Sequence, residues 1–183
     1  MQDEQSLAQK IQQGDKEAFA QLYETHFDRI YRYVVLKVGS RAEAEDMTQQ
    51  VFVRAFESAH AYKWKGIPLS AWLFRIAHNL VVDFHRRERK RPTVSLDESL
   101  PVSDSNPQLE VERQFDVERL MSATARLTEA QREVIGLRFA GGLAIAEVAR
   151  VMGKSIGAVK ALQHSAIVAL RKILLEVENS EKG

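Results

Sequence analysis

The chain has 183 residues, of which 45% are hydrophobic and 28% are charged, as in ordinary globular proteins. It contains no cysteine, so disulfides, thiolate metal sites and a cysteine nucleophile are excluded. No apolar run approaches the ~18 residues that span a membrane, and the polar, acidic start of the sequence carries no secretory signal. We expect a cytoplasmic protein without membrane insertion.

The net charge of +1 is unevenly distributed along the chain. Residues 1–91 carry 15 basic and 12 acidic residues, residues 92–112 carry five acidic residues and no basic one, and residues 113–183 carry 11 basic and 8 acidic residues. Two mildly basic segments around an acidic connector indicate two lobes that face nucleic acid. We therefore divide the chain into a first lobe (1–91), a linker (92–112) and a second lobe (113–183).

Apolar residues recur at every third or fourth position in the first lobe, which is the spacing of helices with one buried face. This spacing predicts four helices, at about residues 4–13, 16–38, 41–59 and 68–91. Capping signals agree: Asp15 begins the second helix and Gly39 ends it. Ser40 and Glu43 form a capping box that begins the third helix.

Two polar features follow the second helix. The third helix presents Asp46, Gln49 and Gln50 opposite its apolar stripe, which by itself indicates a solvated face. The next loop alternates aromatic and cationic residues: Tyr62, Lys63, Trp64 and Lys65. Aromatic rings stack on unpaired bases for about 1–3 kcal/mol each, and lysines neutralise phosphates. At least one of the two loop aromatics is expected to fill the core instead.

The fourth helix carries a polar face beside an apolar stripe that is sustained for about four turns. The residues of this polar face are Arg75, Asn79, Asp83, Arg86 and Arg87. Periodicity alone leaves two readings open. The cations could form a solvated helix end near the negative pole of the helix dipole, or they could bind a polyanion.

The linker differs from both lobes in composition. Residues 92–112 contain three of the four prolines in the chain, several serines and no sustained helical stripe before Leu109. This composition is typical of an extended, solvated and flexible connection.

The second lobe is also predicted to be helical, at about residues 109–126, 128–140, 143–151 and 155–177. Thr128 and Gln131 form a capping box, and Gly141 with Gly142 ends the helix that it begins. Ala149 and Gly153 have helix-turn-helix spacing, because the first must be small and the second permits the positive φ of the turn. A packing corner without a DNA role has the same spacing.

The exposed start of the last helix is where a recognition helix would enter the major groove. Its residues are Ser155, Gly157, Ala158, Lys160, Ala161, Gln163 and His164. Lys160 and Gln163 could contact bases or phosphates.

The best cluster for metal or acid–base chemistry is His78, Asp83 and His85. On a helix Asp83 lies about 140° around the axis from His78, so the three side chains cannot converge on one ion. No phosphate-binding glycine loop, zinc-protease motif or nucleophile elbow occurs. We expect no enzyme, no catalytic residue, no cofactor and no metal.

Two segments resemble a known family. The ordered, gap-free series Trp72-Leu73, Arg75-Ile76-Ala77, Asn79, Asp83 and Arg86-Arg87 resembles the promoter-melting segment of bacterial sigma factors of the extracytoplasmic-function (ECF) group. Residues 127–134 and 157–164 resemble the minus-thirty-five-binding domain of the same sigma factors. The resemblance covers both lobes in the same order.

The resemblance implies an all-α protein of two small helical domains that directs RNA polymerase to promoters. Asp46, Gln49 and Gln50 would dock on the polymerase clamp, and the second lobe would pack on the flap. The loop residues Tyr62 to Lys65, with Trp72, Arg75, Asn79, Arg86 and Arg87, would hold the opened minus-ten strand. Residues 155–164 would read the minus-thirty-five element. An anti-sigma factor is the further expected partner. The linker would thread the polymerase, where its acids could mimic nucleic acid or could simply aid solubility.

Three departures from the family pattern concern the second lobe. Ala144 stands where a capping serine is usual, which should cost about 1 kcal/mol locally. Ser165 and Ile167 stand where arginines are frequent, so binding to the minus-thirty-five element should be weaker and less sensitive to salt.

Two other functions fit parts of the sequence: a stand-alone helix-turn-helix regulator, which would leave the aromatic loop and the acidic linker without a use, and a helical adaptor that binds only proteins. The sigma-factor reading requires two separate bodies, so a single continuous core would contradict it.

Overall fold

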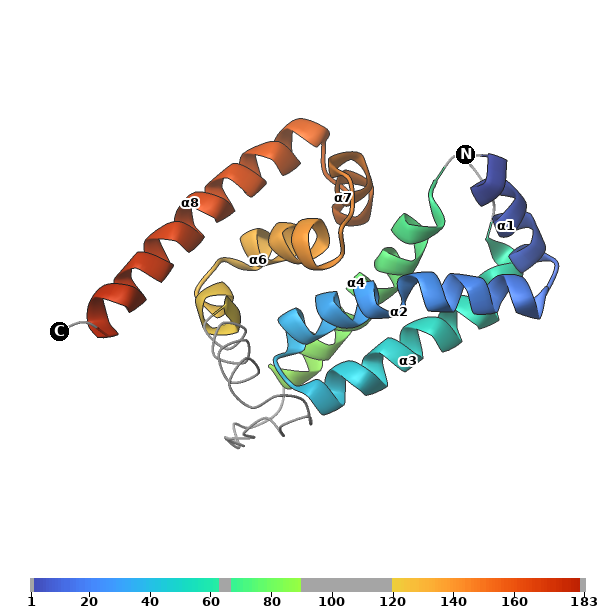
Figure 1. Ribbon diagram of the computed structural model, residues 1–183, viewed down its shortest axis with the longest axis horizontal. Helices are drawn as coiled ribbons and strands as arrows, with labels where there is room; N and C mark the ends of the chain where they lie inside the picture. The colour runs from blue at the N-terminus through green and yellow to red at the C-terminus, as the bar shows by residue number, and fades with distance from the viewer. Residues whose placement is uncertain (1, 63–66, 90–119, 182–183) are drawn as a thin grey trace, which may run out of the picture.

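The computed structural model describes residues 2–62, 67–89 and 120–181, and all regular structure within them is helical (Figure 1). The first lobe contains α1 (Gln2–Gln12), α2 (Lys16–Val38), α3 (Arg41–Ser58), the 3₁₀ turn η1 (Ala59–Ala61) and α4 (Leu69–Glu88). The second contains helical residues 120–125, α6 (Glu129–Ile135), the π-helical turn η2 (Gly136–Ala140), α7 (Ile145–Met152) and α8 (Ile156–Glu181). The expected all-α class is confirmed. The predicted linker and the first part of the helix expected from residue 109 lie outside the described residues.

Capping residues set the helix ends where the sequence predicted them. Asp15 Oδ1 accepts a hydrogen bond from the N–H of Ala18 at 3.0 Å and begins α2. Gly39 ends that helix at φ 78°. The Thr128 box is complete, because the Thr128 hydroxyl accepts from the N–H of Gln131 and the Gln131 side chain accepts from the N–H of Thr128.

One predicted helix changes its winding. The helix expected over 128–140 is α-helical only to Ile135 and then widens into η2, where the N–H of Gly141 donates to Gly136 O at 2.8 Å. Gly136 lies so close to the Tyr33 ring that a Cβ there would stand 3.2 Å from it. Because Tyr33 belongs to the other lobe, the sequence around residue 136 gave no local signal for this turn.

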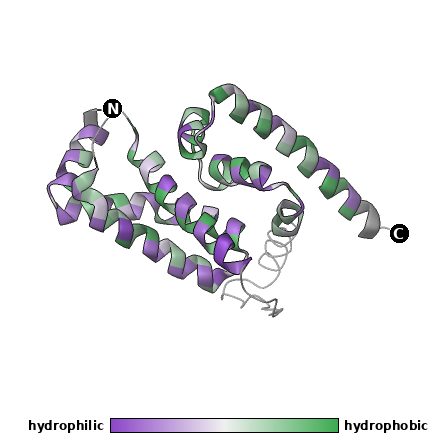
Figure 2. Ribbon diagram, turned by 180° about the vertical axis from the view of Figure 1, so that it is seen from behind, coloured by the Kyte–Doolittle hydropathy of each residue, from purple (hydrophilic) through white to green (hydrophobic). Residues whose placement is uncertain are grey.

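Each lobe buries the apolar stripes of its helices. In the first lobe α2, α3 and α4 pack on one another around Leu22, Ile30, Val51 and Leu73, which are fully buried. In the second lobe α6, α7 and α8 pack around a separate set of buried residues: Val134, Leu137, Leu143, Val148 and Val159. Each such side chain contributes about 1.5–3 kcal/mol by leaving water. Figure 2 shows hydrophilic and hydrophobic residues alternating along the helices, as one-sided burial requires.

The two lobes pack against each other, a contact that the sequence did not predict. η2 packs on α2, α7 packs on α4, and the buried residues of both lobes form one continuous hydrophobic cluster. Figure 1 shows α6 and α7 of the second lobe beside α2 and α4 of the first, with α8 on the far side of the second lobe. Gly141 permits this approach, because a Cβ there would stand 2.6 Å from the Phe74 ring. The lobe contact depends on residues far apart in the sequence, so helical periodicity could not reveal it.

Candidate nucleic-acid and polymerase interface

The polar face of α4 is exposed along its length. Arg75, Asn79, Arg86 and Arg87 are all exposed, while the apolar stripe of the same helix is buried. Arg86 Nη2 lies 3.4 Å from Asp83 Oδ1, an exposed pair that leaves the guanidinium accessible. Four polar side chains therefore project from one rigid helix in a form that phosphates and bases could reach.

His85 adds no charge to this face at neutral pH. Burial and the nearby cations Lys37 and Arg132 lower the pKa of the His85 ring. The positive charge at this end of α4 therefore belongs to its arginines.

Tyr62, at the start of the predicted aromatic loop, is packed into the first lobe. Tyr62 is only 7% exposed, its hydroxyl donates to Ile67 O at 2.6 Å, and its ring lies 4.7 Å from the Trp72 ring. Burial raises the pKa of Tyr62 to about 12. Tyr62 thus follows the core-filling alternative that the sequence left open, and its ring is not available to a base in this conformation. Lys63, Trp64 and Lys65 lie outside the described residues.

The outer face of α3 is broader than the sequence indicated. Asp46, Gln49 and Gln50 are exposed, as predicted, and Val53 and Phe56 continue the same face with 55% and 52% exposure. The sequence analysis did not include Val53 and Phe56 in this face. The available signal was that both positions lie outside the apolar stripe of the helix. Large exposed apolar side chains beside polar ones are typical of a protein-binding surface.

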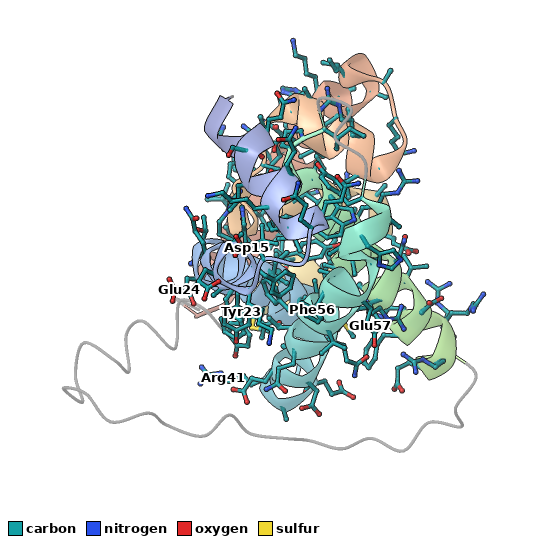
Figure 3. The ribbon with its side chains drawn as sticks, turned by 90° about the vertical axis from the view of Figure 1, so that its right-hand side faces the viewer. Asp15, Tyr23, Glu24, Arg41, Phe56 and Glu57 are labelled. Carbon is teal, nitrogen blue, oxygen red and sulfur yellow. The ribbon has the colours of Figure 1, made fainter. Side chains whose placement is uncertain are left out.

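The apolar part of this face joins α3 to α2. The Phe56 ring packs edge-on against Phe19 at 5.1 Å, and Tyr23 packs on Phe52 at 4.7 Å. Figure 3 shows Tyr23 on α2 and Phe56 on α3 at this side of the molecule. We call the exposed residues Asp46, Gln49, Gln50, Val53 and Phe56 the α3 face.

The helix-turn-helix has the predicted geometry. Gly153 ends α7 at φ 62°, and the Ser155 hydroxyl accepts from the N–H of Ala158 at 3.2 Å, capping α8. Ala144 supplies no side-chain cap to α7; instead its N–H donates to Glu147 Oε2 at 2.7 Å. The turn is therefore held by backbone geometry and by one acidic side chain.

The start of α8 is accessible with one exception. Ser155, Gly157, Ala158, Lys160, Ala161 and His164 are exposed. Gln163 is half-buried, and its Oε1 accepts a hydrogen bond from Arg138 Nε at 3.0 Å. Gln163 is thus already engaged with a side chain of another helical element of the lobe, η2.

Within the described residues, no three His, Asp or Glu side chains lie together as metal ligands. None of the helices in the part of the chain that the structure describes combines the length and apolarity that crossing a bilayer demands.

Comparison with known proteins identifies both lobes. Residues 22–91 match the family model "Sigma-70 region 2", and residues 123–172 match "Sigma-70, region 4". The chain is 34% identical over 157 residues to ECF RNA polymerase sigma factor SigL of Mycobacterium tuberculosis, which covers 85% of this chain and 88% of SigL. This chain is an ECF RNA polymerase sigma factor. It is also 38% identical over 170 residues to ECF sigma factor BldN of Streptomyces coelicolor, covering 92% of this chain and 64% of BldN.

The hydrophobic cluster shared by the lobes therefore does not exclude a sigma factor, although the sequence analysis required two separate bodies. The predicted site residues of this sigma factor divide between its two matched regions. The α3 face and the polar face of α4 lie within region 2, and the start of α8 lies within region 4. The individual contacts remain predictions.

Solved structures share the fold. CnrH in complex with the cytosolic domain of CnrY superposes with a TM-score of 0.73 at 24% identity, over 93% of this chain and 96% of that one. The sigma factor RpoE of Bartonella quintana, solved with the anti-sigma factor NepR, gives 0.65 at 23% identity, over 85% and 96%.

Proposed function

We propose that this sigma factor binds core RNA polymerase through region 2 and directs it to promoters. The α3 face supplies the docking surface on the polymerase clamp, with Val53 and Phe56 as its apolar centre and Asp46, Gln49 and Gln50 as its polar rim. This composition matches that of protein interfaces, in which buried apolar residues carry most of the binding free energy.

The polar face of α4 then binds the opened minus-ten strand. Arg86 and Arg87 neutralise phosphates, and Asn79 hydrogen-bonds an exposed base edge. Trp64, from the neighbouring loop, stacks on a base. Separating DNA costs about 1.4 kcal/mol per base-pair step in lost stacking, and stacking on an aromatic side chain returns about 1–3 kcal/mol per base. Binding can therefore supply the free energy of strand opening without nucleotide hydrolysis.

Region 4 reads the upstream element. The first turns of α8, with Lys160 and His164 exposed, enter the major groove at the minus-thirty-five element, and the same lobe packs on the polymerase flap. Because RpoE was solved with an anti-sigma factor, we also propose a protein antagonist of this chain. The sigma factor acts in the cytoplasm under this proposal, because that is where RNA polymerase works.

The observation that carries this proposal is that one chain holds both sigma regions, each with a polar face turned to solvent. A stand-alone helix-turn-helix regulator would have no use for region 2, which accounts for residues 22–91.

Strand opening tests the minus-ten assignment. Purified chain and core polymerase are mixed with promoter DNA, and unpaired thymines are detected by permanganate. We expect opening only with both proteins present. Asn79→Ala and Trp64→Ala should each lose opening yet keep polymerase binding, whereas Gln9→Ala, which removes an exposed amide from α1, should match the wild type. Binding of duplex DNA that core polymerase does not alter would favour the stand-alone regulator.

Polymerase binding tests the α3 face separately. Phe56→Ser should weaken binding to core polymerase by at least tenfold, because it removes an apolar anchor from the centre of the face. Val82→Ser, which truncates an exposed apolar residue on α4, is the control. If both variants bound core polymerase equally well, Phe56 would not be part of the docking surface.

A further inference from the structure

A buried carboxylate joins the two lobes. Glu133, from α6, accepts hydrogen bonds from three groups of the first lobe: the Tyr33 hydroxyl at 2.7 Å, Lys37 Nζ at 2.6 Å and His78 Nδ1 at 2.8 Å. The side chains of Lys37 and Glu133 are only 3% and 7% exposed. We call these four residues the Glu133 cluster. All three hydrogen bonds to the carboxylate cross from one lobe to the other.

The electrostatics of the cluster favour the ionised acid. Burial alone would raise the pKa of Glu133, but the hydrogen bond from His78 and the charge of Lys37 outweigh burial and lower that pKa to about 2. Burial and the nearby carboxylate raise the pKa of Tyr33, so its hydroxyl remains a donor. Lys37 and Glu133 therefore meet as a buried ion pair, and separating the lobes exposes both partners to water.

Further contacts surround the cluster. The Ser70 hydroxyl, on α4, donates to Glu147 Oε1 at 2.5 Å, on α7. Arg29 Nε, on α2, donates to Gly141 O at 2.8 Å. The Phe74 ring covers Gly141, where no side chain intervenes. The complementarity extends across the whole contact between lobes.

The closed arrangement is too short for two promoter elements. The Ser70–Glu147 bond places α7 at the beginning of α4, and α7 leads by one turn into α8. α4 has 20 residues and α7 has 8, or about 30 Å and 12 Å of helix. The elements named minus-ten and minus-thirty-five lie about 25 base pairs apart, which is about 85 Å of B-DNA at 3.4 Å per pair. The lobes must therefore separate before both can be bound.

We propose that Tyr33, Lys37 and His78 form an intramolecular docking site for Glu133, which holds the free sigma factor closed and must release before both promoter elements are bound. The consequence for promoters rests on the proposed function. The closure itself does not, because it concerns the free chain.

Energy transfer between two dyes measures closure directly. The chain has no cysteine, so Gln12→Cys and Lys172→Cys place one dye on an exposed position of each lobe. The free chain should show one high-transfer state, and core polymerase with promoter DNA should convert it to a low-transfer state. A free chain that is already in the low-transfer state would overturn the proposal.

Matched variants test whether the Glu133 carboxylate holds the two lobes together. Glu133→Gln leaves Lys37 buried without a counter-charge, so the open-to-closed ratio should rise by on the order of 100-fold or more. Glu129→Gln is the control: Glu129 is on the same helix and also pairs across the lobes, with Arg89 at 3.3 Å, but both side chains are exposed at 67% and 75%. This control should change the ratio by less than about fivefold. Glu133→Gln that stays as closed as wild type would refute the assignment.

A second variant covers the case in which Glu133→Gln disturbs folding. Lys37→Met removes the other charge from the first lobe and should also open the chain. The double variant should open less than the product of the two single effects, because the pair is coupled. Independent effects of the two substitutions would overturn the docking site. If the variants open as expected but wild type directs no transcription, the proposed function fails and the closure stands.

Discussion

The two surfaces that we propose bind nucleic acid differ in charge. α4 turns three arginines and an amide to solvent, whereas the first turns of α8 expose one lysine and one histidine among uncharged residues. Gln163, which would add a second polar contact, is bonded to Arg138. If the proposed assignment holds, region 2 attracts the opened strand mainly through charge. Under the same proposal, region 4 relies on close approach to DNA, because Gly157, Ala158 and Ala161 have small or no side chains and are exposed. The comparison predicts that promoter affinity depends more on α4 than on α8.

The largest effect should come from α4. Arg86→Ala with Arg87→Ala removes two cations from its end, so promoter affinity of the polymerase complex should fall about 10–100-fold. The slope of log affinity against log salt should become shallower by about 1.4. Filter binding over a salt series measures both. Lys10→Ala with Lys16→Ala, two exposed cations elsewhere in the first lobe, changes net charge equally and should have little effect. Equal losses would show that only total charge matters.

A smaller loss should follow from the recognition helix. Lys160→Ala removes one phosphate contact, which should make the salt slope shallower by about 0.9 and lower affinity about 3–10-fold. The effect should disappear on a promoter whose minus-thirty-five element has been replaced. If Lys160→Ala lowered promoter affinity more than the α4 double variant does, promoter affinity would depend more on α8 than on α4.

A gain of similar size should follow from adding a cation to α8. Ser165→Arg places a guanidinium on an exposed position that follows His164, at the cost of the exposed Gln131–Ser165 hydrogen bond of 2.8 Å. Affinity for the upstream element should rise about 3-fold, with a salt slope steeper by about 0.9. Ser122→Arg adds the same charge to an exposed position among the helical residues 120–125 of the same lobe and should give no such gain.

The smallest effect concerns stability. Ala144→Ser supplies the missing acceptor at the start of α7 and should raise the free energy of unfolding by about 1 kcal/mol, seen as a higher midpoint in thermal unfolding. Ala146→Ser, inside the same helix and exposed, should instead lower it slightly. If both serines behave alike, a hydroxyl at residue 144 does not cap the first-turn N–H groups of α7.

Local sequence signals predicted the elements of this fold well. Asp15, Gly39, Thr128 and Gly153 set helix ends through their own side chains or φ angles, which depend on few neighbours. α8 runs past the predicted end at residue 177 to Glu181, because no glycine or proline interrupts it before Gly183.

The contact between lobes was not predicted, for a physical reason. Lys37 lies among the buried residues of α2, and Glu133 directly precedes the buried Val134, yet each charge looks unfavourable in a core until its partner is known. A cation and an anion inside apolar stripes were the available signal. The α3 face was predicted in part: its polar residues were recognised, but Val53 and Phe56 needed the packing of α2 to show that they stay uncovered.

Gly141 gives this protein a steric control point. Its backbone, at φ −79°, suits any amino acid, so the obstacles to a larger side chain there are the Phe74 ring and the nearby carbonyl oxygen of Leu137. Alanine, serine and valine at this position would form a graded series of wedges between the lobes. The size of the side chain at residue 141, without any change in charge, would then set the fraction of molecules in which the two lobes are apart and both promoter elements can be bound.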